Sequence, residues 1–476
     1  MIRKSSCRFT GRATSMTVAL MCLFALSATA VRAASVTVDC DGGAADFATI
    51  QAAVNSLTPS DFNTITVGGT CTESVSISSF DNLAVQAVAG GASVLATSTS
   101  VFDIFDSPSV RLSGLTMDAG GGEYGVFAFE SAVSITGSSV TGASDTGVVA
   151  LLEAEVNLGG INPGDGVTIH DNLFGAFASR GELNLRGQVT IEDNTEDALI
   201  YSVSEGTHIG RDLGNTIRNN GAGVTVLDGG QVRFSGLHTI ENNGPYGLFA
   251  QRPDRVVFSA YPGSSSGPPF YGTAIRNHAV WGVIVVSTRL DFFGPDEQLI
   301  HSVNNNGAAP YAKDAGVWVG RQAEARLRNM TIDDNYGHGV HGTLGAYVNL
   351  LNTSINNNDR HGVRLSWNTT GDLGSFSILD GTQVGPNMTI TGNGKKAIKC
   401  AKTSVLAGDR SGISPIACDD ISGFGADMPG LSGGLEEPDE ASGGFGPALD
   451  MDERVLDRSR AIEAYAEMQR ASGGSR

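Results

Sequence analysis

Short hydrophobic runs recur through the middle of this 476-residue chain, separated by polar steps that contain asparagine. A β-rich run such as Val189-Thr190-Ile191 precedes each step, a second run such as Gly339-Val340 follows it, and a third such as Val348-Asn349-Leu350 lies about ten residues further on. The shortest spacings between steps are 22 to 26 residues. Three strands and three turns in ~23 residues are typical of one coil of a parallel β-helix. The asparagines are Asn172, Asn194, Asn220, Asn243, Asn277, Asn306, Asn335, Asn358 and Asn393.

The second run predicts which side chains face the interior. In eleven aligned copies, the residues one and three positions after the leading residue are small or aliphatic. Period-2 alternation places such positions inside a narrow solenoid, so the chain is expected to form an all-β, right-handed parallel β-helix of ten or eleven coils. The leading residues are Gly125, Gly147, Gly175, Asp197, Gly223, Gly247, Gly282, Gly316, Gly339, Gly362 and Ala397.

The outward position between the two inward rows is unexpectedly apolar in the first seven copies. Such a strip requires a cover or a ligand. Inserted loops or a C-terminal helix are the simplest cover, and a sugar or a partner protein is the alternative. Longer spacings between steps predict such loops, notably the Pro/Ser/Gly-rich stretch Arg252 to Thr273. The strip comprises Phe127, Val149, Phe177, Leu199, Thr225, Phe249 and Ile284.

The asparagine series has a structural and a functional interpretation. Asparagines stacked at one turn can hydrogen-bond from coil to coil and tolerate left-handed backbone. The same regularity would also suit a repeated ligand contact. The structural interpretation is favoured, because it accounts for the asparagines without any ligand.

The two ends of the chain differ from the repeats. Residues 1–33 combine a cationic start, an apolar run too short to span a bilayer and a small-residue cleavage site after Ala33, which predicts a signal peptide. The β-helix domain is expected over 34–421. A Gly-rich acidic linker follows over 422–446, and residues 447–476 form either a docked helix or a disordered tail. No segment after the leader is long and apolar enough to anchor the chain in a membrane.

The net charge of the chain narrows the classes of partner that it can bind. The formal net charge is −19, and removal of the five basic leader residues leaves about −24. Such a surface repels phosphate backbones and anionic lipid, which argues against nucleic acid and membrane partners. Together with the predicted signal peptide, this favours secretion to the extracellular or periplasmic space.

Four cysteines remain after the leader. Three pairings are open to Cys40, Cys71, Cys400 and Cys418. In an oxidising compartment the natural pairing is one local disulfide at each end of the solenoid, Cys40 with Cys71 and Cys400 with Cys418.

Three short segments near the start of the mature chain run from Asp46 to Val54, then Ile65-Thr66-Val67, and finally Thr70 to Val75. Together they resemble the opening of pectin-lyase-like right-handed β-helix proteins. In that family an amphipathic helix caps the N-terminal end of the solenoid, which implies such a helix at about 46–57. A cap is physically needed, because the first coil otherwise exposes an apolar end and unpaired strand edges.

The last four outward positions of the second run are polar or aromatic and should stack in one column. They are Trp318, His341, Arg364 and Lys399. A β-helix can bind sugar chains along such a column, where cations hold carboxylates and a histidine serves as a base. The catalytic candidates are therefore His341, Arg364 and Lys399. The competing interpretation is a set of solvated surface residues that stack by accident.

Further residues around this column are candidates for substrate binding. They are Trp318, Arg321, His338, Arg360, His361 and Trp367. A metal site at His338 and His361 is not predicted, because two histidines are too few ligands. No calcium motif is present, and whether calcium takes part as a cofactor stays open.

Known catalytic motifs of the fold are missing. Asp333-Asp334 and Gly337-His338-Gly339 fall in a single coil, and Ala397-Ile398-Lys399 lacks an arginine, so the arrangement of polygalacturonases is not reproduced. Fold alone does not fix function. The candidates are a lyase, hydrolase or epimerase that acts on an acidic polysaccharide, a non-catalytic surface or adhesion protein, and a structural solenoid.

Overall fold

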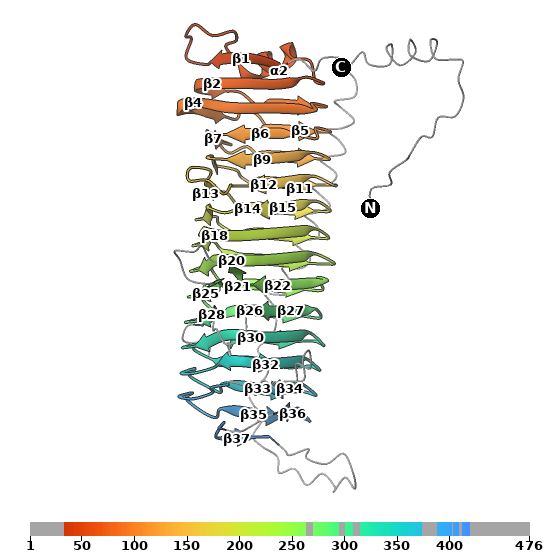
Figure 1. The fold of residues 1–476 in the computed structure, drawn as a ribbon, viewed down its shortest axis with the longest axis vertical. Helices are drawn as coiled ribbons and strands as arrows, with labels where there is room; N and C mark the ends of the chain where they lie inside the picture. The colour runs from red at the N-terminus through yellow and green to blue at the C-terminus, as the bar shows by residue number, and fades with distance from the viewer. Residues whose placement is uncertain are drawn as a thin grey trace, which may run out of the picture.

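The computed structural model describes residues 33–262, 270–294, 300–307, 315–373, 388–401, 403–408 and 412–418. These residues form a right-handed parallel β-helix of about 12 turns, slightly more than the ten or eleven expected. Figure 1 shows the coils stacked from the N-terminal end to the C-terminal end. The predicted leader up to residue 32, the linker 422–446 and the segment 447–476 lie outside the described residues.

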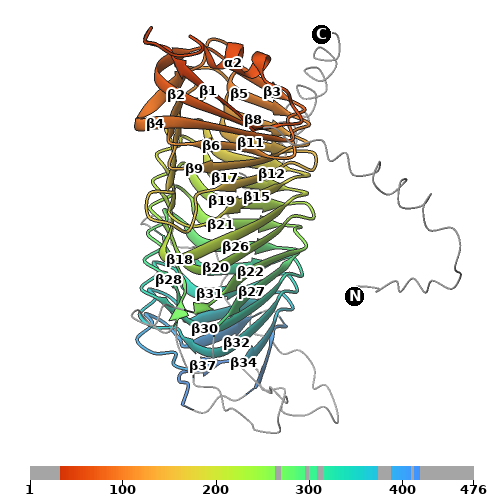
Figure 2. The same cartoon turned by 45° about the horizontal axis from the view of Figure 1, so that its top comes forward.

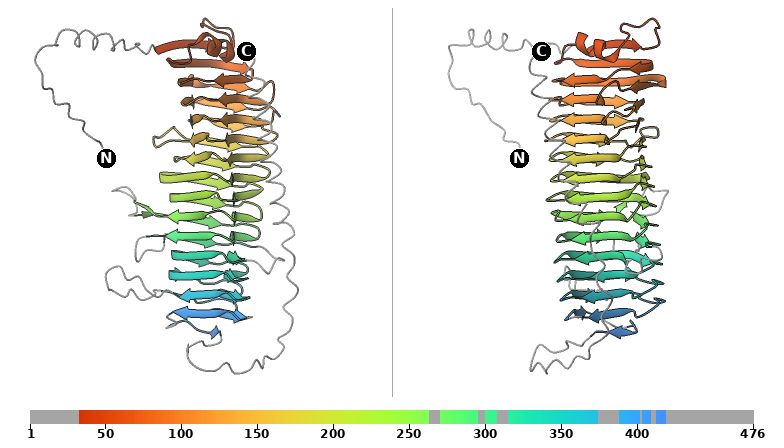
Figure 3. Two further views of the ribbon diagram at one scale, coloured as in Figure 1. Left: turned by 90° about the vertical axis from the view of Figure 1, so that its right-hand side faces the viewer. Right: turned by 180° about the vertical axis from the view of Figure 1, so that it is seen from behind.

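Two large parallel sheets build the solenoid. The second run of each coil enters a 14-stranded sheet, and the third and first runs together enter a 21-stranded sheet. Both sheets extend along the whole stack (Figure 3). The 14-stranded sheet contains β3 (Val75–Ser78), β5 (Ser100–Phe105), β8 (Tyr124–Phe129), β11 (Thr146–Leu151), β14 (Phe174–Ser179), β17 (Asp197–Ser202), β19 (Ala222–Leu227), β21 (Tyr246–Gln251), β26 (Trp281–Val286), β29 (Ala315–Gly320), β31 (His338–Gly342), β33 (Val363–Ser366), β35 (Ile398–Ala401) and β37 (Ile416–Ala417).

The 21-stranded sheet covers the other sides of each coil, and some of its strands bend around a corner. It contains β1 (Ala33–Asp39), β2 (Phe62–Thr72), β4 (Asn82–Leu95), β6 (Val110–Ser113), β7 (Leu115–Asp118), β9 (Ala132–Thr136), β10 (Ser139–Thr141), β12 (Glu155–Leu158), β13 (Val167–His170), β15 (Glu182–Leu185), β16 (Val189–Glu192), β18 (Glu205–Arg218), β20 (Gln231–Glu241), β22 (Arg255–Ser259), β25 (Thr273–Arg276), β27 (Arg289–Phe293), β28 (His301–Asn304), β30 (Glu324–Asp333), β32 (Tyr347–Ser354), β34 (Thr370–Leu373) and β36 (Val405–Gly408).

A short helix caps the N-terminal end, as the resemblance implied. Helix α2 (Ile50–Ser56) lies across the first coil (Figure 2). Thr49 caps it by accepting a hydrogen bond from the amide of Ala52, and the Glu73 carboxylate accepts from the amides of Ile50 and Gln51 at 2.7 and 2.9 Å. A carboxylate at a helix N-terminus is favourable because the first amides have no partner within the helix.

Both predicted disulfides are present. Cys40 pairs with Cys71 near the capping helix, and Cys400 pairs with Cys418 in the last coils. The loop insertion predicted at Arg252 to Thr273 is only partly a loop, since Arg255–Ser259 forms strand β22 and Tyr261–Pro262 (β23) pairs antiparallel with Phe270–Tyr271 (β24). No helix within the described ranges is long and apolar enough to cross a membrane.

The asparagine series is a structural ladder. The side-chain carbonyl of Asn358, for example, accepts hydrogen bonds from the backbone amide and the side-chain amide of Asn335 at 3.1 and 2.8 Å. One predicted member is wrong. Asn277 has a left-handed φ of 60° just before the ladder, and His278 takes the ladder position instead, with its amide bonded to Asn306 at 3.2 Å. The ladder asparagines are Asn172, Asn194, Asn220, Asn243, Asn306, Asn335, Asn358 and Asn393.

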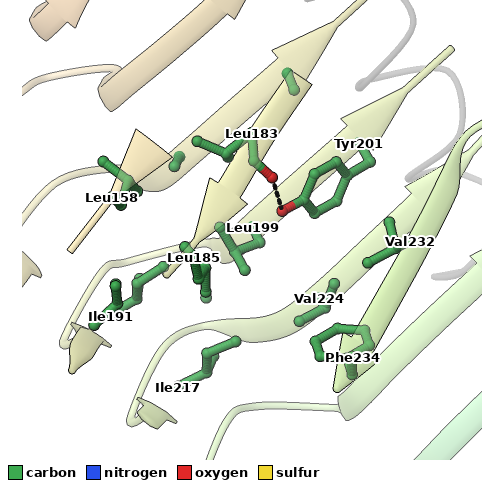
Figure 4. Close-up of a cluster of buried hydrophobic side chains, with 14 of the residues drawn as sticks. Leu158, Leu183, Leu185, Ile191, Leu199, Tyr201, Ile217, Val224, Val232 and Phe234 are labelled. Atoms are coloured by element: carbon green, nitrogen blue, oxygen red, sulfur yellow. Dashed lines mark hydrogen bonds between the residues drawn. The ribbon is translucent and has the colours of Figure 1, made fainter. Parts of the chain in front are cut away.

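The inward register is correct in every aligned coil except one. Strand β17 is shifted by one residue, so Leu199 pairs with Ala176 and faces the interior, while Ile200 pairs with Phe177 and faces outward. Figure 4 shows Leu199 and Tyr201 in the interior, where the Tyr201 hydroxyl donates to the Leu183 carbonyl. The turn after Asn194 has one more residue than the turn after Asn172. The run Ala198-Leu199-Ile200 is apolar throughout, so alternation could not reveal the shift.

Candidate functional site

The predicted column on the 14-stranded sheet is present in register. Trp318 pairs with His341, His341 with Arg364, and Arg364 with Lys399. Adjacent strands are ~4.8 Å apart, so these side chains form one continuous row on four consecutive coils. His341, Arg364 and Lys399 are half-buried, and the His341 ring lies 3.2 Å from the Ser366 hydroxyl. The structure therefore brings the three proposed catalytic residues together.

The flanking candidates lie around this column with very different exposure. Trp318 is only 6% exposed and packs in a buried cluster, so its ring does not present an open stacking surface. Trp367 is 51% exposed at the turn between β33 and β34, and Arg321 is exposed at the corresponding turn after β29. Arg360 is half-buried beside His361. The substrate-binding candidates thus do not form one open surface.

His338 and His361 form a second ladder inside the turn. Their rings stack at 5.3 Å with an interplanar angle of 5°, and both residues are buried. The His338 Nδ1 atom accepts the amide of His361 at 3.2 Å, and the His361 Nδ1 atom accepts the amide of Lys396 at 3.1 Å. One nitrogen of each ring is therefore committed to holding the turn, as are the ladder asparagines three residues earlier in the same turns.

Burial keeps this histidine pair uncharged. Desolvation, followed by the charge of His341, lowers the pKa of His338 well below its usual value. Desolvation and the Lys399 ammonium lower the pKa of His361 to about 4. Both rings are neutral near pH 7, because burial and nearby cations penalise a further positive charge.

A second, more strongly charged site lies on the outer face of the 21-stranded sheet. In the third runs, the outward side chains at 231–235, 255–259, 289–293 and 324–328 carry five arginines and two carboxylates, a net charge of 5 − 2 = +3 in a chain of net charge −19. We call this surface the arginine face. Its charged members are Arg233, Arg255, Arg289, Arg326 and Arg328, with Asp291 and Glu324.

A buried carboxylate organises the arginine face. Asp291 is fully buried, and its carboxylate lies 2.6 Å from Arg255, 2.9 Å from Arg289 and 3.9 Å from Arg326. Glu324 also pairs with Arg326, at 2.5 Å, so two carboxylates face three guanidinium groups and positive charge remains at the surface. Buried charges persist only when they are paired and hydrogen-bonded, which explains why the arginines are held in fixed positions around Asp291.

Two further arginines extend the positive charge. Arg233 is exposed and Arg328 is half-buried; within the described part of the chain, no carboxylate lies within 4.0 Å of either guanidinium. Burial and the neighbouring Arg326 lower the pKa of Arg328 from its usual value. Arg255 and Arg328 each lie 5.8 Å from the centre of the Phe293 ring. The two guanidinium groups thus flank an aromatic ring, a favourable cation–π arrangement.

The arginine face borders a hollow of about 500 Å³. Its wall combines acidic, cationic, amide and aromatic side chains, which suits a polar ligand with an apolar ring face. The lining residues include Glu205, Gln231, Arg233, Arg255, Val257 and Phe293. Further along the stack, Tyr347 and Asn349 both donate to the Asp372 carboxylate at 3.0 Å.

Sequence reasoning missed the arginine face because only the second run was aligned. The third runs hold its signal, since their outward positions place arginine in four consecutive coils. They read Val232-Arg233-Phe234, Arg255-Val256-Val257, Arg289-Leu290-Asp291 and Arg326-Leu327-Arg328. An alignment of these third runs is therefore sufficient to predict a positive cluster on this sheet.

Comparison with known proteins finds similar solved structures but no family. No protein-family profile and no curated protein sequence matches the chain. Among solved structures, the A-module of mannuronan C-5 epimerase AlgE6 from Azotobacter vinelandii is similar, with a TM-score of 0.41, 13% identity, and coverage of 75% of this chain and 94% of that chain. The alginate lyase from Paenibacillus sp. str. FPU-7 gives a TM-score of 0.24 and 13% identity over 81% and 99% of the two chains. The likeness is one of fold alone.

Proposed function

We propose that this protein binds an acidic polysaccharide along the arginine face. The observation that carries the proposal is a face with five arginines, three of them held around the buried Asp291, in an otherwise acidic chain. Consecutive coils present cations about every 4.8 Å, which suits an extended polymer whose carboxylates recur along its length. Guanidinium groups bind carboxylates in a planar, two-point geometry, and Phe293 offers a ring for stacking. Two disulfides fit a protein that works outside the reducing cytoplasm.

The binding role is tested on the two arginines outside the Asp291 cluster. Arg233→Gln/Arg328→Gln should weaken binding of polygalacturonate or alginate about 10- to 100-fold, because each charge-assisted contact contributes roughly 1.5–3 kcal/mol before losses. Isothermal titration calorimetry at low salt would measure the change. Neither arginine pairs with a described carboxylate, so the melting temperature should stay near that of the wild type.

A matched control lies on the other part of the same sheet. Arg218→Gln/Arg276→Gln removes two exposed arginines that are paired with Glu192 and Glu241 at 2.6 and 2.8 Å. This variant loses the same formal charge but should bind as the wild type does. If both double variants weaken binding equally, the effect comes from net charge alone, and the arginine face is not the binding site. Equal affinity for a carboxyl-reduced polymer would exclude an acidic ligand.

We further propose a catalytic role for the His341, Arg364 and Lys399 column. The half-buried His341 pairs with Arg364, and Lys399 lies one coil beyond Arg364. His341 can take the proton α to a uronate carboxylate, while the cations stabilise the charge that develops there. The electron pair then forms a C=C bond as the bond to the neighbouring sugar breaks, and the departing oxygen takes a proton from water, which leaves an unsaturated uronate. The alternative is a non-catalytic surface, adhesion or structural protein, in which the arginine face binds without reaction.

The His341→Ala variant distinguishes the catalytic role from the non-catalytic alternative. We expect the variant to fold normally, because the side chain is on the outer side of β31, and to lose any lyase activity by at least 100-fold while polymer binding persists. Absorbance of the unsaturated uronate and reducing-end assays would follow the reaction, and circular dichroism would follow the fold. Silence of the wild-type protein across acidic polysaccharides would leave the binding function and discard the catalytic role.

A further inference from the structure

The outer face of the 14-stranded sheet is buried between β8 and β29. No described residue from outside this sheet and its turns belongs to the cluster of hydrophobic side chains on this face. The apolar strip, with Ile200 in place of Leu199 and extended by Trp318, consists of outward side chains that are between 0% and 6% exposed. All of them except Thr225 belong to a second hydrophobic cluster, separate from the interior core. The strip residues are Phe127, Val149, Phe177, Ile200, Thr225, Phe249, Ile284 and Trp318.

Every described member of this second cluster comes from the sheet itself or from the turns beside its strands. Side chains on one sheet face stand roughly perpendicular to the sheet, so neighbours bury their sides but leave their tips toward solvent. A second layer of structure is needed to bury such a face completely. Rings such as Phe127, Phe177 and Phe249, which are 0% to 1% exposed, therefore require a cover.

We propose that the C-terminal segment 447–470 of this same chain docks on the strip as an amphipathic helix. Its 24 residues would span ~36 Å as a helix. The strip runs over eight strands from β8 to β29, which is seven steps of ~4.8 Å, or ~34 Å. The segment therefore has the length that the strip requires.

The end of the described chain also favours this occupant. Cys418 is bonded to Cys400 in β35, so the chain leaves the solenoid beside the 14-stranded sheet. The four strand steps from β37 back to β29 cover only ~19 Å. The 28 residues 419–446 have a root-mean-square reach of about 29 Å as a flexible linker, which is enough to return the chain to the strip.

The chemistry of the segment matches the strip. Val455, Arg458, Ile462 and Tyr465 recur at helical spacing and share one face. A small polar group interrupts the apolar surface beside the strip: Asp197 is buried and accepts hydrogen bonds from Thr225 at 2.5 Å and from Tyr246 at 2.9 Å.

The positions of the opposite charges also agree. Arg458 lies 11 residues into the segment, ~17 Å along a helix. Asp197 lies in β17, four strand steps from β29, or ~19 Å. A helix that runs from Trp318 toward Phe127 therefore brings the guanidinium close to the buried carboxylate.

The test uses the full-length mature protein with changes in the segment alone. Ile462→Asp/Tyr465→Asp should uncover the strip, giving a several-fold rise in fluorescence of the dye ANS and a red shift in the emission of Trp318. Arg460→Gln/Ala464→Asp makes the same change in net charge on the opposite side of the helix and should change neither signal. Equal responses of the two double variants, or no response of either, would overturn the proposal.

Truncation provides an independent measurement. A chain that ends at residue 421 keeps both disulfides and should show the same dye binding, and a synthetic peptide 447–470 should reverse it. If the truncated chain fails to fold, the full-length variants still decide the matter. If the full-length protein sediments as a dimer that Phe177→Asp dissociates, a second copy is the cover and the proposal is wrong.

Discussion

Acidification from pH 7 to about pH 4 should destabilise this β-helix strongly. Six of its eight histidines are buried, and desolvation lowers the pKa of each. The pKa values of His238, His278, His301 and His361 fall to about 4, and those of His208 and His338 lie well below the usual value. These rings pack inside the solenoid or its turns, where a positive charge is not solvated.

The direction of this pH effect on stability follows from the difference in proton binding between the folded and unfolded chain. Between about pH 6.5 and pH 4 the unfolded chain protonates these histidines while the folded chain does not, so the free energy of unfolding falls as the pH falls. Two buried carboxylates act in the opposite sense. Desolvation raises the pKa of Asp103 and of Asp197 to about 6, so the folded chain gains protons there first. Six groups outweigh two, and the net effect is loss of stability in acid.

Thermal unfolding followed by circular dichroism from pH 8 to pH 4 would measure this effect. The melting temperature should be nearly constant above pH 7 and decline continuously below about pH 6.5. His301→Gln should flatten the decline, because it removes one titrating ring, whereas substitution of the partly exposed His170 should not. A melting temperature that is unchanged down to pH 4 would contradict the neutral, buried state of these histidines.

The second large effect is expected from a cavity in the aromatic stack of the interior. Phe258 is fully buried between Phe234 at 4.5 Å and Phe292 at 4.4 Å, with the rings nearly parallel. Phe258→Ala should reduce the free energy of unfolding by about 3–5 kcal/mol, because it removes buried apolar surface and leaves a void that neighbouring coils cannot fill.

A surface phenylalanine provides the matched control for this substitution. Phe62 is 55% exposed, and Phe62→Ala should cost less than about 1 kcal/mol. Urea denaturation of both variants would give the two values. Losses of similar size would show that the stacked phenylalanines do not carry the stability of the middle coils.

The three proposals concern different surfaces: the arginine face, the column of His341, Arg364 and Lys399, and the apolar strip. The first two lie on different sheets, and the third would cover only the strip between β8 and β29. Loss of the segment should therefore leave the arginine face intact. Polymer binding by the Ile462→Asp/Tyr465→Asp variant would show whether the two proposals are independent.

Local sequence patterns were sufficient to predict the solenoid, both disulfides and the column from Trp318 to Lys399, whereas the capping helix was implied by the family resemblance. Each of these depends on a short period or on local chemistry: alternation every two residues, a coil of about 23 residues, or cysteines close in the chain. The two register errors arose where neighbouring residues are too similar or too close for the pattern to distinguish them. Leu199 and Ile200 are both aliphatic, and Asn277 stands directly beside the true ladder residue His278.

Which outward residues form a site depends instead on how the coils pack in three dimensions. Arg255, Arg289 and Arg326 come from three coils and meet only because the third runs stack around Asp291. Alternation placed Trp318 on the outer face and the turn position made His361 a candidate for substrate binding, yet both are buried. Period-2 alternation distinguishes the two faces of a strand, but burial of the outer face depends on a second layer packed against it, which no local pattern reports.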